Sequence, residues 1–341
     1  MGRRRRGTGP SWDGVLVVDK PHGPTSHDVV QDVRRAAGQS RVGHTGTLDP
    51  AATGVLVLCL GRATKLVQFL QAGTKTYRAR LVLGVETDTQ DAEGKVLATR
   101  DASGVDEAAL RRALGELTGE IEQLPPMVSA VKVGGRRLHE AARAGEEVER
   151  EPRRVTVHRL ELLDVQPGER AEAELEITCS AGTYVRTLAH DAGAALGVGG
   201  SLSALRRTAN GPFREDEAHP LDEVVAAGQR REVRALTIAP AEAVARSLPT
   251  VEVADPEVAR RLAQGGRLDA QGHQGAYGLT HRGLLLGVYA DHGGRARPEL
   301  VWTRPEELAA LEAGEDPGGA GEGAGGAGDE APSARTRGQD P

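Results

Sequence analysis

A glycine-punctuated loop at residues 41–54 constrains the fold of this chain more than any other segment. It contains three glycines and leads directly into six apolar residues at 55–60, which predict a buried strand. Glycine loses more backbone entropy on folding than other residues, so such a loop is favoured where the chain must take an unusual path or let a ligand approach closely. Asp49 is the one acidic residue of the loop, and Pro50 restricts the backbone directly after it. We therefore predict that the loop presents the Asp49 carboxylate to a cleft.

Asp49 has two interpretations. A carboxylate with an ordinary pKa of about 3.9 is ionised at neutral pH, so this side chain could act as a nucleophile or a base. An isolated Asp-Pro pair, however, usually begins a turn or caps a helix. His44 and the two threonines between it and Asp49 favour the functional interpretation.

Length and composition limit the class of protein. At 341 residues the chain exceeds one typical domain, so we expect a core-forming body and a smaller module. No uncharged apolar stretch reaches eighteen residues and no signal-peptide pattern occurs, so we expect a soluble, cytoplasmic protein without a membrane partner. Cys59 and Cys179 fit neither a zinc site nor a disulfide framework, and we interpret both as buried, reduced thiols.

The net charge of −6 is unevenly distributed along the chain. Residues 312–341 carry seven acidic residues and two arginines, which leaves 41 basic and 42 acidic residues in 1–311. The tail at 312–341 is rich in glycine and alanine and should be disordered, as should the basic N-terminus at 1–12. Within the body, pairs of arginines usually lie on solvated faces, and only their convergence on one groove would form a phosphate-binding surface. The arginine clusters are at 34, 35 and 41, at 136, 137 and 143, at 150, 153 and 154, and at 206 and 207.

Strands and helices alternate without the regular pattern of a parallel doubly wound sheet. Periodicity predicts strands at 15–18, 55–60, 77–83, 127–133, 155–166, 171–179 and 202–207. It predicts helices capped by Ser26 and at 64–70, 106–117, 138–144 and 184–196. Residues 220–247 suggest helices, and 249–304 read as short strands around one helix at 256–264. Runs of adjacent strands imply an α+β fold, with a mixed, largely antiparallel sheet flanked by helices.

The motif His44-Thr45-Gly46-Thr47-Leu48-Asp49-Pro50 closely resembles the catalytic signature of the bacterial tRNA pseudouridine synthases of the TruB type. Further motifs of that family occur in the same order, and the resemblance covers about residues 13–212. These motifs are Gly14-Val15-Leu16-Val17-Val18-Asp19-Lys20-Pro21 with Gly23-Pro24-Thr25-Ser26, Ala63-Thr64-Lys65, Lys75-Thr76-Tyr77, Thr87-Asp88-Thr89-Gln90-Asp91 and Gly182-Thr183-Tyr184-Val185-Arg186-Thr187.

The resemblance implies a fold, a reaction and a partner. It implies a catalytic pseudouridine synthase domain at 13–247, with an insertion at about 124–154 that grips RNA, and a small β-rich RNA-binding domain of the PUA kind at 248–311. The reaction implied is isomerisation of uridine 55 in the T-loop of tRNA to pseudouridine, with the T-arm stem-loop as partner and no cofactor or metal. The family is also thought to aid tRNA folding. We expect a monomer with no obligate protein partner.

The resemblance also implies roles for single residues. Asp49 is the nucleophile, attacking either C1′ or C6, and Arg186 pairs with its carboxylate. Tyr77 packs against the target base and could move a proton, and Tyr184 lines the same pocket. Taken alone, the arginine would be an ordinary helix-surface residue, and a tyrosine in a strand would be a core residue with a satisfied hydroxyl.

Two further pocket residues follow from the same resemblance. Leu205 corresponds to a pocket-lining leucine, although alone it would be plain core. A base within a folded loop must be everted before a carboxylate can reach it, and His44 resembles the histidine that stacks in the gap left behind. A lone histidine is more often structural.

Other motifs have weaker functional interpretations. Residues 87–91 lack the ligand spacing of a calcium loop, so turn hydrogen bonding is the favoured role. Lys20 could contact phosphate or support the loop of Asp49. Two alternatives to an isomerase remain, an RNA-binding or chaperone protein with a structural carboxylate loop, and an aspartyl hydrolase. An aspartyl hydrolase would need a second acidic residue two positions from Asp49, and the sequence has none there.

Overall fold

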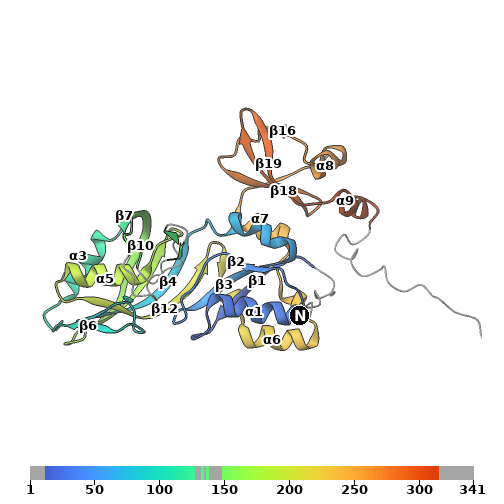
Figure 1. Cartoon of the computed structure of the whole chain (residues 1–341). Coiled ribbons are helices and arrows are strands. Elements are labelled where there is room, and N and C mark those ends of the chain that lie inside the picture. Colours follow the sequence, from blue (N-terminus) through green and yellow to red (C-terminus); the bar gives the residue numbers. More distant parts are fainter. Residues whose placement is uncertain (1–11, 127–131, 134–135, 138–147, 315–341) are drawn as a thin grey trace, which may run out of the picture.

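The computed structural model describes residues 12–126, 132–133, 136–137 and 148–314 (Figure 1). The predicted helix at 138–144, Arg143, most of the predicted strand at 127–133, residues 1–11 of the basic N-terminus and residues 315–341 of the acidic tail lie outside the described residues. Within the described part, the α+β prediction is confirmed. A large mixed sheet flanked by helices forms the body, and a second, smaller sheet follows near the C-terminus.

The large sheet has the strand order β14-β1-β3-β12-β4-β11-β10-β7, with β2 added to β3 and β13 added to β12. Only two of its pairings, β1 with β14 and β3 with β12, are parallel among the described strands. Its strands are β1 (Gly14–Lys20), β2 (Val42–His44), β3 (Thr53–Leu60), β4 (Lys75–Leu83), β7 (Gly119–Gln123), β10 (Arg153–Gln166), β11 (Glu172–Cys179), β12 (Gly200–Asn210), β13 (Phe213–Arg214) and β14 (His219–Pro220). Two short hairpins are separate, β5 (Val85–Thr87) with β6 (Val96–Thr99) and β8 (Lys132–Val133) with β9 (Arg136–Arg137).

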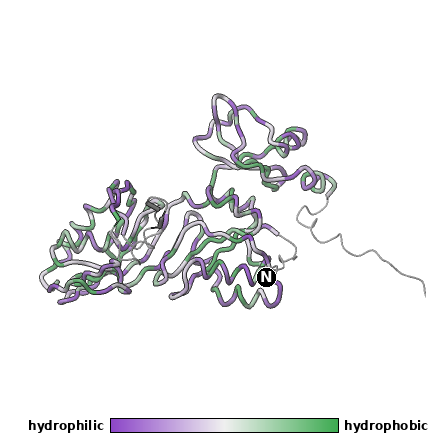
Figure 2. The backbone as a smooth tube through the Cα atoms, viewed as in Figure 1, coloured by the Kyte–Doolittle hydropathy of each residue, from purple (hydrophilic) through white to green (hydrophobic). Residues whose placement is uncertain are grey.

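Helices cover the large sheet in two groups (Figure 1). Helices α1 and α6 pack together beside β1 and β3, while α3 and α5 cover the half that contains β4, β10, β11 and β12. Polar and apolar residues alternate along these helices, as expected for helices with one buried face (Figure 2). The helices of the body are α1 (Ser26–Ala36), α2 (Val67–Leu70), α3 (Glu107–Glu116), α5 (Val185–Ala195), α6 (Leu221–Arg230) and α7 (Pro240–Ser247), with 3₁₀ turns η1 (Gly61–Leu66), η2 (Glu215–Glu217) and η3 (Val233–Leu236).

Both faces of β1 and β3 are buried, which explains their continuous apolar sequences. In β3, Leu56 and Leu58 face the core beneath α1 and α6, whereas Val55 and Val57 face a second core shared with α7 and the C-terminal sheet. Strand β4 instead alternates buried and exposed residues, because its second face is open to solvent. Both patterns agree with the sequence prediction.

The two halves of the large sheet meet at a short parallel seam. Strands β3 and β12 share only two residue pairs, Thr53 with Arg206 and Gly54 with Arg207. Gly54 has a φ of +97°, and a Cβ added there would lie 2.2 Å from the carbonyl oxygen of Arg207. Only glycine fits at this point, and the loop that bears Asp49 ends here.

Two predicted helix starts differ in detail. Thr25, not Ser26, caps α1: its hydroxyl accepts from the Asp28 amide, and the Asp28 carboxylate accepts from the Thr25 amide. The predicted helix at 64–70 is a 3₁₀ turn followed by a single α-helical turn. Ser26 is thereby free to bond elsewhere, which matters for the site.

The C-terminal module is a five-stranded sheet in the order β15-β17-β18-β19-β16 with its own apolar core. It joins the body through the second core, in which Leu285 and Val288 lie with Val15 and Val244. No helix in the described part of the chain is long and apolar enough to cross a membrane. The elements of the module are β15 (Thr250–Glu252), α8 (Pro256–Ala263), β16 (Leu268–Asp269), β17 (Ala276–His281), β18 (Leu284–His292), β19 (Arg295–Val301) and α9 (Pro305–Glu312).

Candidate active site

A pocket opens at the seam between the two halves of the sheet. Its wall is formed by the loop at 46–52, the start of β4, residues 91–92, the segment at 182–186 and the middle of β12. Asp49, Tyr77, Tyr184, Arg186 and Leu205 all line it. Five of the six site residues predicted from the sequence therefore come together from segments far apart in the chain.

The loop that carries Asp49 is held by buried polar side chains on three elements. The Lys20 ammonium, at the end of β1, donates to the carbonyl oxygens of Pro21, Pro50 and Ala52 at 2.9, 3.0 and 2.7 Å. Burial lowers the pKa of Lys20 to about 8. Of the two roles considered for Lys20, support of the loop is the one that these contacts favour.

Two other buried side chains complete this support. The Ser26 hydroxyl, on α1, accepts from the Leu48 amide at 2.8 Å and donates to the Leu48 carbonyl at 2.9 Å. The Asn210 amide, on β12, donates to the Thr45 hydroxyl at 2.9 Å. Because backbone groups on both sides of Asp49 are bonded to fixed elements, the carboxylate is presented from a rigid loop.

Arg186 lies between two carboxylates. One terminal nitrogen of its guanidinium is 3.2 Å from Asp49 Oδ2, and the other is 3.4 Å from Asp91 Oδ2. Arg186 is only 5% exposed, whereas 45% of the Asp49 side chain, which lines the pocket, is exposed. The arrangement aims one oxygen of Asp49 and leaves the carboxylate accessible to a ligand.

The surroundings of Asp49 shift its titration. Burial raises the pKa of Asp49 above its ordinary value, the positive charge of Arg186 opposes that rise, and the negative charge of Asp91 adds to it. The carboxylate is therefore a stronger base than a solvated aspartate, as a nucleophile or proton acceptor requires.

The start of α5 positions Tyr184 and Arg186. Gln123, a buried residue at the end of β7, accepts from the Tyr184 amide at 2.7 Å and donates to the Tyr184 carbonyl at 3.1 Å. The Arg186 guanidinium lies 5.9 Å from the centre of the Tyr184 ring. Both contacts fix the helix N-terminus against the pocket.

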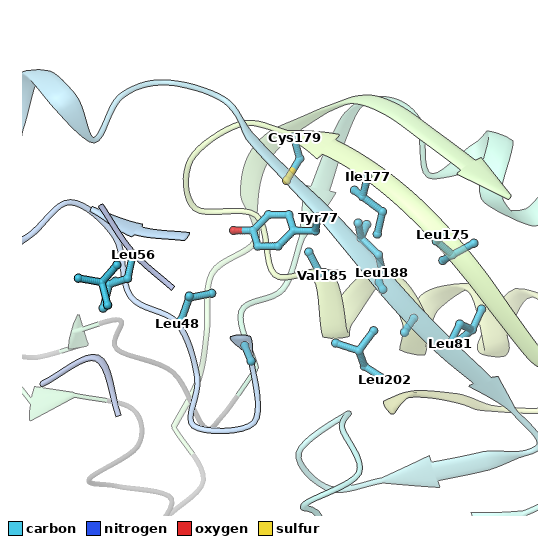
Figure 3. Close-up of a cluster of buried hydrophobic side chains, with 14 of the residues drawn as sticks. Leu48, Leu56, Tyr77, Leu81, Leu175, Ile177, Cys179, Val185, Leu188 and Leu202 are labelled. Carbon is cyan, nitrogen blue, oxygen red and sulfur yellow. The ribbon is translucent and has the colours of Figure 1, made fainter. Parts of the chain in front are cut away.

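Tyr77, on β4, lines the pocket. Figure 3 shows its ring between Val185 and Leu48, with the hydroxyl directed toward the side on which Leu48 lies. Burial raises the pKa of the Tyr77 hydroxyl, and the charge of Arg207 opposes the rise. In the register of β4 with β12, Tyr77 lies two positions from the residue that pairs with Leu205. Residues two apart in a strand face the same side, so Tyr77 and Leu205 lie on the same side of the sheet. Together they offer apolar surface to a flat ring.

His44 is the sixth predicted residue, and it does not line the pocket. It ends β2, where it pairs with Leu58 of β3, and it is partly buried. Burial lowers the pKa of His44, and the charge of Arg207 lowers it further. The imidazole is accordingly neutral at physiological pH.

Three residues of the site were not identified from the sequence: Asp91, Gln123 and Arg207. The motif at 87–91 was interpreted as a turn, and it does form one, since Thr89 and Glu93 both donate to Asp91 Oδ1. Asp91 Oδ2, however, faces Arg186. Nothing in the local sequence distinguishes these two uses of one carboxylate. Among the described residues, no three His, Cys, Asp or Glu side chains are grouped so that they could hold a metal ion.

The arginine pair at 206 and 207 is not a solvated phosphate-binding surface. Arg206 forms ion pairs with Asp19 and Glu215 at 2.9 and 2.8 Å. Arg207 is 1% exposed and donates to main-chain carbonyls. The local sequence could not separate these environments, because adjacent residues of a strand face opposite sides of the sheet.

Comparison with known proteins identifies the family. A model of the TruB family pseudouridylate synthase N-terminal domain matches residues 34–185, and a model of the tRNA pseudouridylate synthase B C-terminal domain matches residues 186–245. The chain belongs to the TruB family. It is therefore a tRNA pseudouridine synthase, an isomerase, as the signature around Asp49 indicates.

Relatives of the TruB family match most of the chain. The tRNA pseudouridine synthase B of Symbiobacterium thermophilum is 52% identical over 262 residues, which are 77% of this chain and 85% of the relative. That of Thermobifida fusca is 47% identical over 297 residues, 85% of this chain and 98% of the relative.

Solved structures have the same fold. A chain in the crystal structure of a Cbf5-Nop10-Gar1 complex is similar with a TM-score of 0.67 and 26% identity, covering 89% of this chain and 93% of that one. A chain in the structure of an H/ACA RNP bound to a substrate RNA containing 2′-deoxyuridine is similar with a TM-score of 0.65 and 25% identity, covering 89% and 93%. The pseudouridine synthase fold is thus confirmed.

Proposed function

We propose that this synthase converts uridine 55 in the T-loop of tRNA to pseudouridine, with Asp49 as the nucleophile and no cofactor. The observation that carries the proposal is the Asp49–Arg186–Asp91 arrangement at the wall of a pocket that Tyr77 also lines. A half-exposed carboxylate aimed by a buried guanidinium is suited to attack on a carbon atom of a bound ring or sugar.

The isomerisation exchanges one bond of the sugar for another. The N1–C1′ bond breaks, the uracil turns within the pocket, the C5–C1′ bond forms, and the proton on C5 is lost while N1 gains one. Asp49 attacks C1′ or C6, and either route places additional negative charge on the uracil ring. In this proposal Tyr77 and Leu205, which both line the pocket, hold the ring, and the Tyr77 hydroxyl moves a proton.

A uridine within a folded RNA loop reaches this pocket only after eversion, which costs a few kcal/mol. We propose that His44 offsets part of that cost by stacking where the base was. A neutral imidazole stacks on bases without an unpaired charge, and the lowered pKa of His44 keeps it neutral. Its place beside the pocket, not within it, fits a contact with the rest of the RNA loop.

We further propose the domain division expected from the sequence. Residues 13–247 form the catalytic domain, in which the segment at about 124–154 grips the T-arm, and residues 248–311 form a PUA-like RNA-binding domain. The arginines in the segment at about 124–154 favour a contact with phosphate. The protein would act as a monomer, and it would also aid tRNA folding.

Asp49→Asn on an unmodified tRNA transcript is the direct test. We expect pseudouridine formation to fall by about 1,000-fold or more, because the attacking group is gone. The affinity for the transcript should stay within threefold of wild type. Asp101→Asn, at an exposed turn carboxylate, is the matched control and should keep full activity. A transcript with cytidine at position 55 should give no product with any variant.

A role in RNA folding alone predicts a different result. If the carboxylate loop were only structural, Asp49→Asn would leave product formation undiminished, and the proposed nucleophile would be wrong. Turnover without magnesium on the T-arm stem-loop separates the isomerase from an aspartyl hydrolase, whose phosphoryl chemistry needs a metal ion.

A further inference from the structure

Arg207, in the middle of β12, is the largest fully buried side chain in the described part of the protein. Its Nε donates to the Val55 carbonyl at 2.7 Å, and its two terminal nitrogens donate to the carbonyls of Thr47 and Gly46 at 3.3 and 3.2 Å. All three acceptors are neutral. No carboxylate within residues 12–126 or 148–314 forms an ion pair with it.

The stability of the fold does not explain why the Arg207 charge is buried. Taking a guanidinium out of water costs several kcal/mol, and arginine cannot lose its proton to escape that cost. Neutral carbonyls accept its hydrogen bonds without neutralising its charge. Apolar residues of similar volume in such places are often at least as stable. A buried, unneutralised charge beside an active site therefore calls for a role in the reaction.

Arg207 contacts the loop that carries Asp49 and also lies next to Tyr77. Gly46 and Thr47 belong to the loop that carries Asp49, so two of the three hydrogen bonds hold that loop. In the register of the sheet, Arg207 lies directly opposite Tyr77, and both residues line the pocket.

Its charge also acts on the neighbouring titratable groups. Burial and, to a smaller extent, the charge of Arg207 lower the pKa of Lys75 to about 8, and the charge of Arg207 also adds to the lowering of the pKa of His44 by burial. Lys75 therefore loses its charge in mildly alkaline solution, whereas Arg207 stays charged.

We propose that Arg207 is a positioning residue for the isomerisation: it fixes the first half of the Asp49 loop and places a permanent positive charge beside Tyr77, where the everted uracil gains negative charge. The proposal rests on the proposed role of Asp49. At 1% exposure the guanidinium does not touch RNA, so its effect is on the chemical step and not on binding.

The test uses single-turnover kinetics of the full chain on an unmodified tRNA transcript, with filter binding of the same transcript and thermal melting. Arg207→Gln removes the charge, and Arg207→Lys keeps the charge but cannot reach all three carbonyls. Arg80→Gln is the matched control, because Arg80 lies on the exposed face of the same sheet, paired with Glu174. Asp49→Asn is measured alongside.

We expect Arg207→Gln to lower the single-turnover rate at least 100-fold while the Kd for the transcript changes less than threefold. Arg207→Lys should restore part of that rate, with a loss of about tenfold relative to wild type, and Arg80→Gln should stay within twofold. A merely structural arginine predicts that rate, binding and melting temperature fall together, and that result would overturn the proposal.

Other outcomes are equally decisive. A folded Arg207→Gln variant with a rate within fivefold of wild type also overturns the inference. If that variant does not fold, Arg207→Lys decides: a slower rate at unchanged Kd supports the inference, and a wild-type rate refutes it. An active Asp49→Asn variant would sink the proposed function itself, whereas an inactive one beside near-normal Arg207 variants would sink only the role of Arg207.

Discussion

Buried polar residues support the loop that carries Asp49, and Asp49 is the residue that they position. Lys20, Ser26 and Arg207 are buried and bond to the backbone of one loop, and that loop presents Asp49 to the pocket. Arg186 then fixes the direction of the carboxylate, and Asp91 fixes Arg186. The Asp49 carboxylate is thus held in one direction while 45% of its side chain stays exposed.

Asp91→Asn should slow product formation about 10- to 150-fold, because a hydrogen bond to a charged group contributes about 1.5–3 kcal/mol. The pH profile should move as well. The negative charge of Asp91 raises the pKa of Asp49, so its removal lowers that pKa and shifts the acid limb of the rate to lower pH. Asp88→Asn, at an exposed carboxylate that accepts from the Lys95 amide, is the control. An acid limb that stays in place or moves upward would contradict the network.

Lys20→Met should change how stability depends on pH. The folded chain releases the Lys20 proton near pH 8, whereas the unfolded chain keeps it to about pH 10.5. Between these values the unfolded state binds more protons, so the free energy of unfolding of the wild type should rise with pH relative to the variant. Urea unfolding at pH 7, 8, 9 and 10 measures this, with Lys65→Met at an exposed lysine as the control. If the free energy of unfolding of the wild type falls relative to that of Lys20→Met from pH 8 to 10, the lowered pKa of Lys20 is refuted.

At the scale of elements, the site depends on where strands and helices end. Helix α1 supplies its first residue to the loop, α5 supplies its first turn to the pocket, and β3 meets β12 over only two residue pairs. The ends of elements carry backbone groups and side chains that are not committed to regular hydrogen bonding. They are therefore available for a binding site.

Ser26→Ala and Thr25→Ala separate these roles on one helix. Thr25→Ala removes the cap and should lower stability by about 1 kcal/mol with little change in activity. Ser26→Ala leaves the Leu48 amide buried without its partner and should cost about 1–3 kcal/mol. It should also slow the single-turnover rate, since Leu48 adjoins Asp49. Equal rates for the two variants would show that the loop does not need this anchor.

Local patterns predicted the elements well and the site in part. The apolar runs of β1 and β3 and the alternation in β4 follow from burial on two faces or one, which is visible in sequence. Asp49, Arg186 and Tyr77 stand in motifs. Gln123 contacts a residue that is 61 positions away in the sequence, and Arg207 contacts one that is more than 150 positions away. Such contacts leave no signal in the local sequence.

For the whole molecule, the junction between the body and the C-terminal module sets the distance between the pocket and any RNA contact on that module. Arg62 ties the parts together: Nε contacts Asp13 at 2.6 Å, a terminal nitrogen contacts Glu307 at 2.7 Å, and the guanidinium lies 5.0 Å from the centre of the Trp302 ring. The shared apolar core lies beside this contact. The module and the body should therefore unfold as one unit.

Arg62→Ala should lower the free energy of unfolding by about 2–3 kcal/mol, because two largely buried carboxylates lose their partner. Urea unfolding followed by tryptophan fluorescence should then show a broader transition than the single one of wild type. Arg111→Ala, which breaks an exposed helix pair with Glu107, should cost only about 0.3–0.5 kcal/mol. Similar losses for both variants would mean that the junction is held by its apolar core alone.

The proposed function requires that Asp49 acts on an everted uridine in this pocket. A crystal structure of the protein with a T-arm stem-loop carrying 5-fluorouridine at position 55 tests it most directly. We expect the fluorinated base to be turned out of the loop and held between Tyr77 and Leu205, with an Asp49 oxygen at or bonded to C1′ or C6. A base that remains stacked within the RNA, or that lies in the pocket with Asp49 turned away from the sugar and the ring, would contradict it.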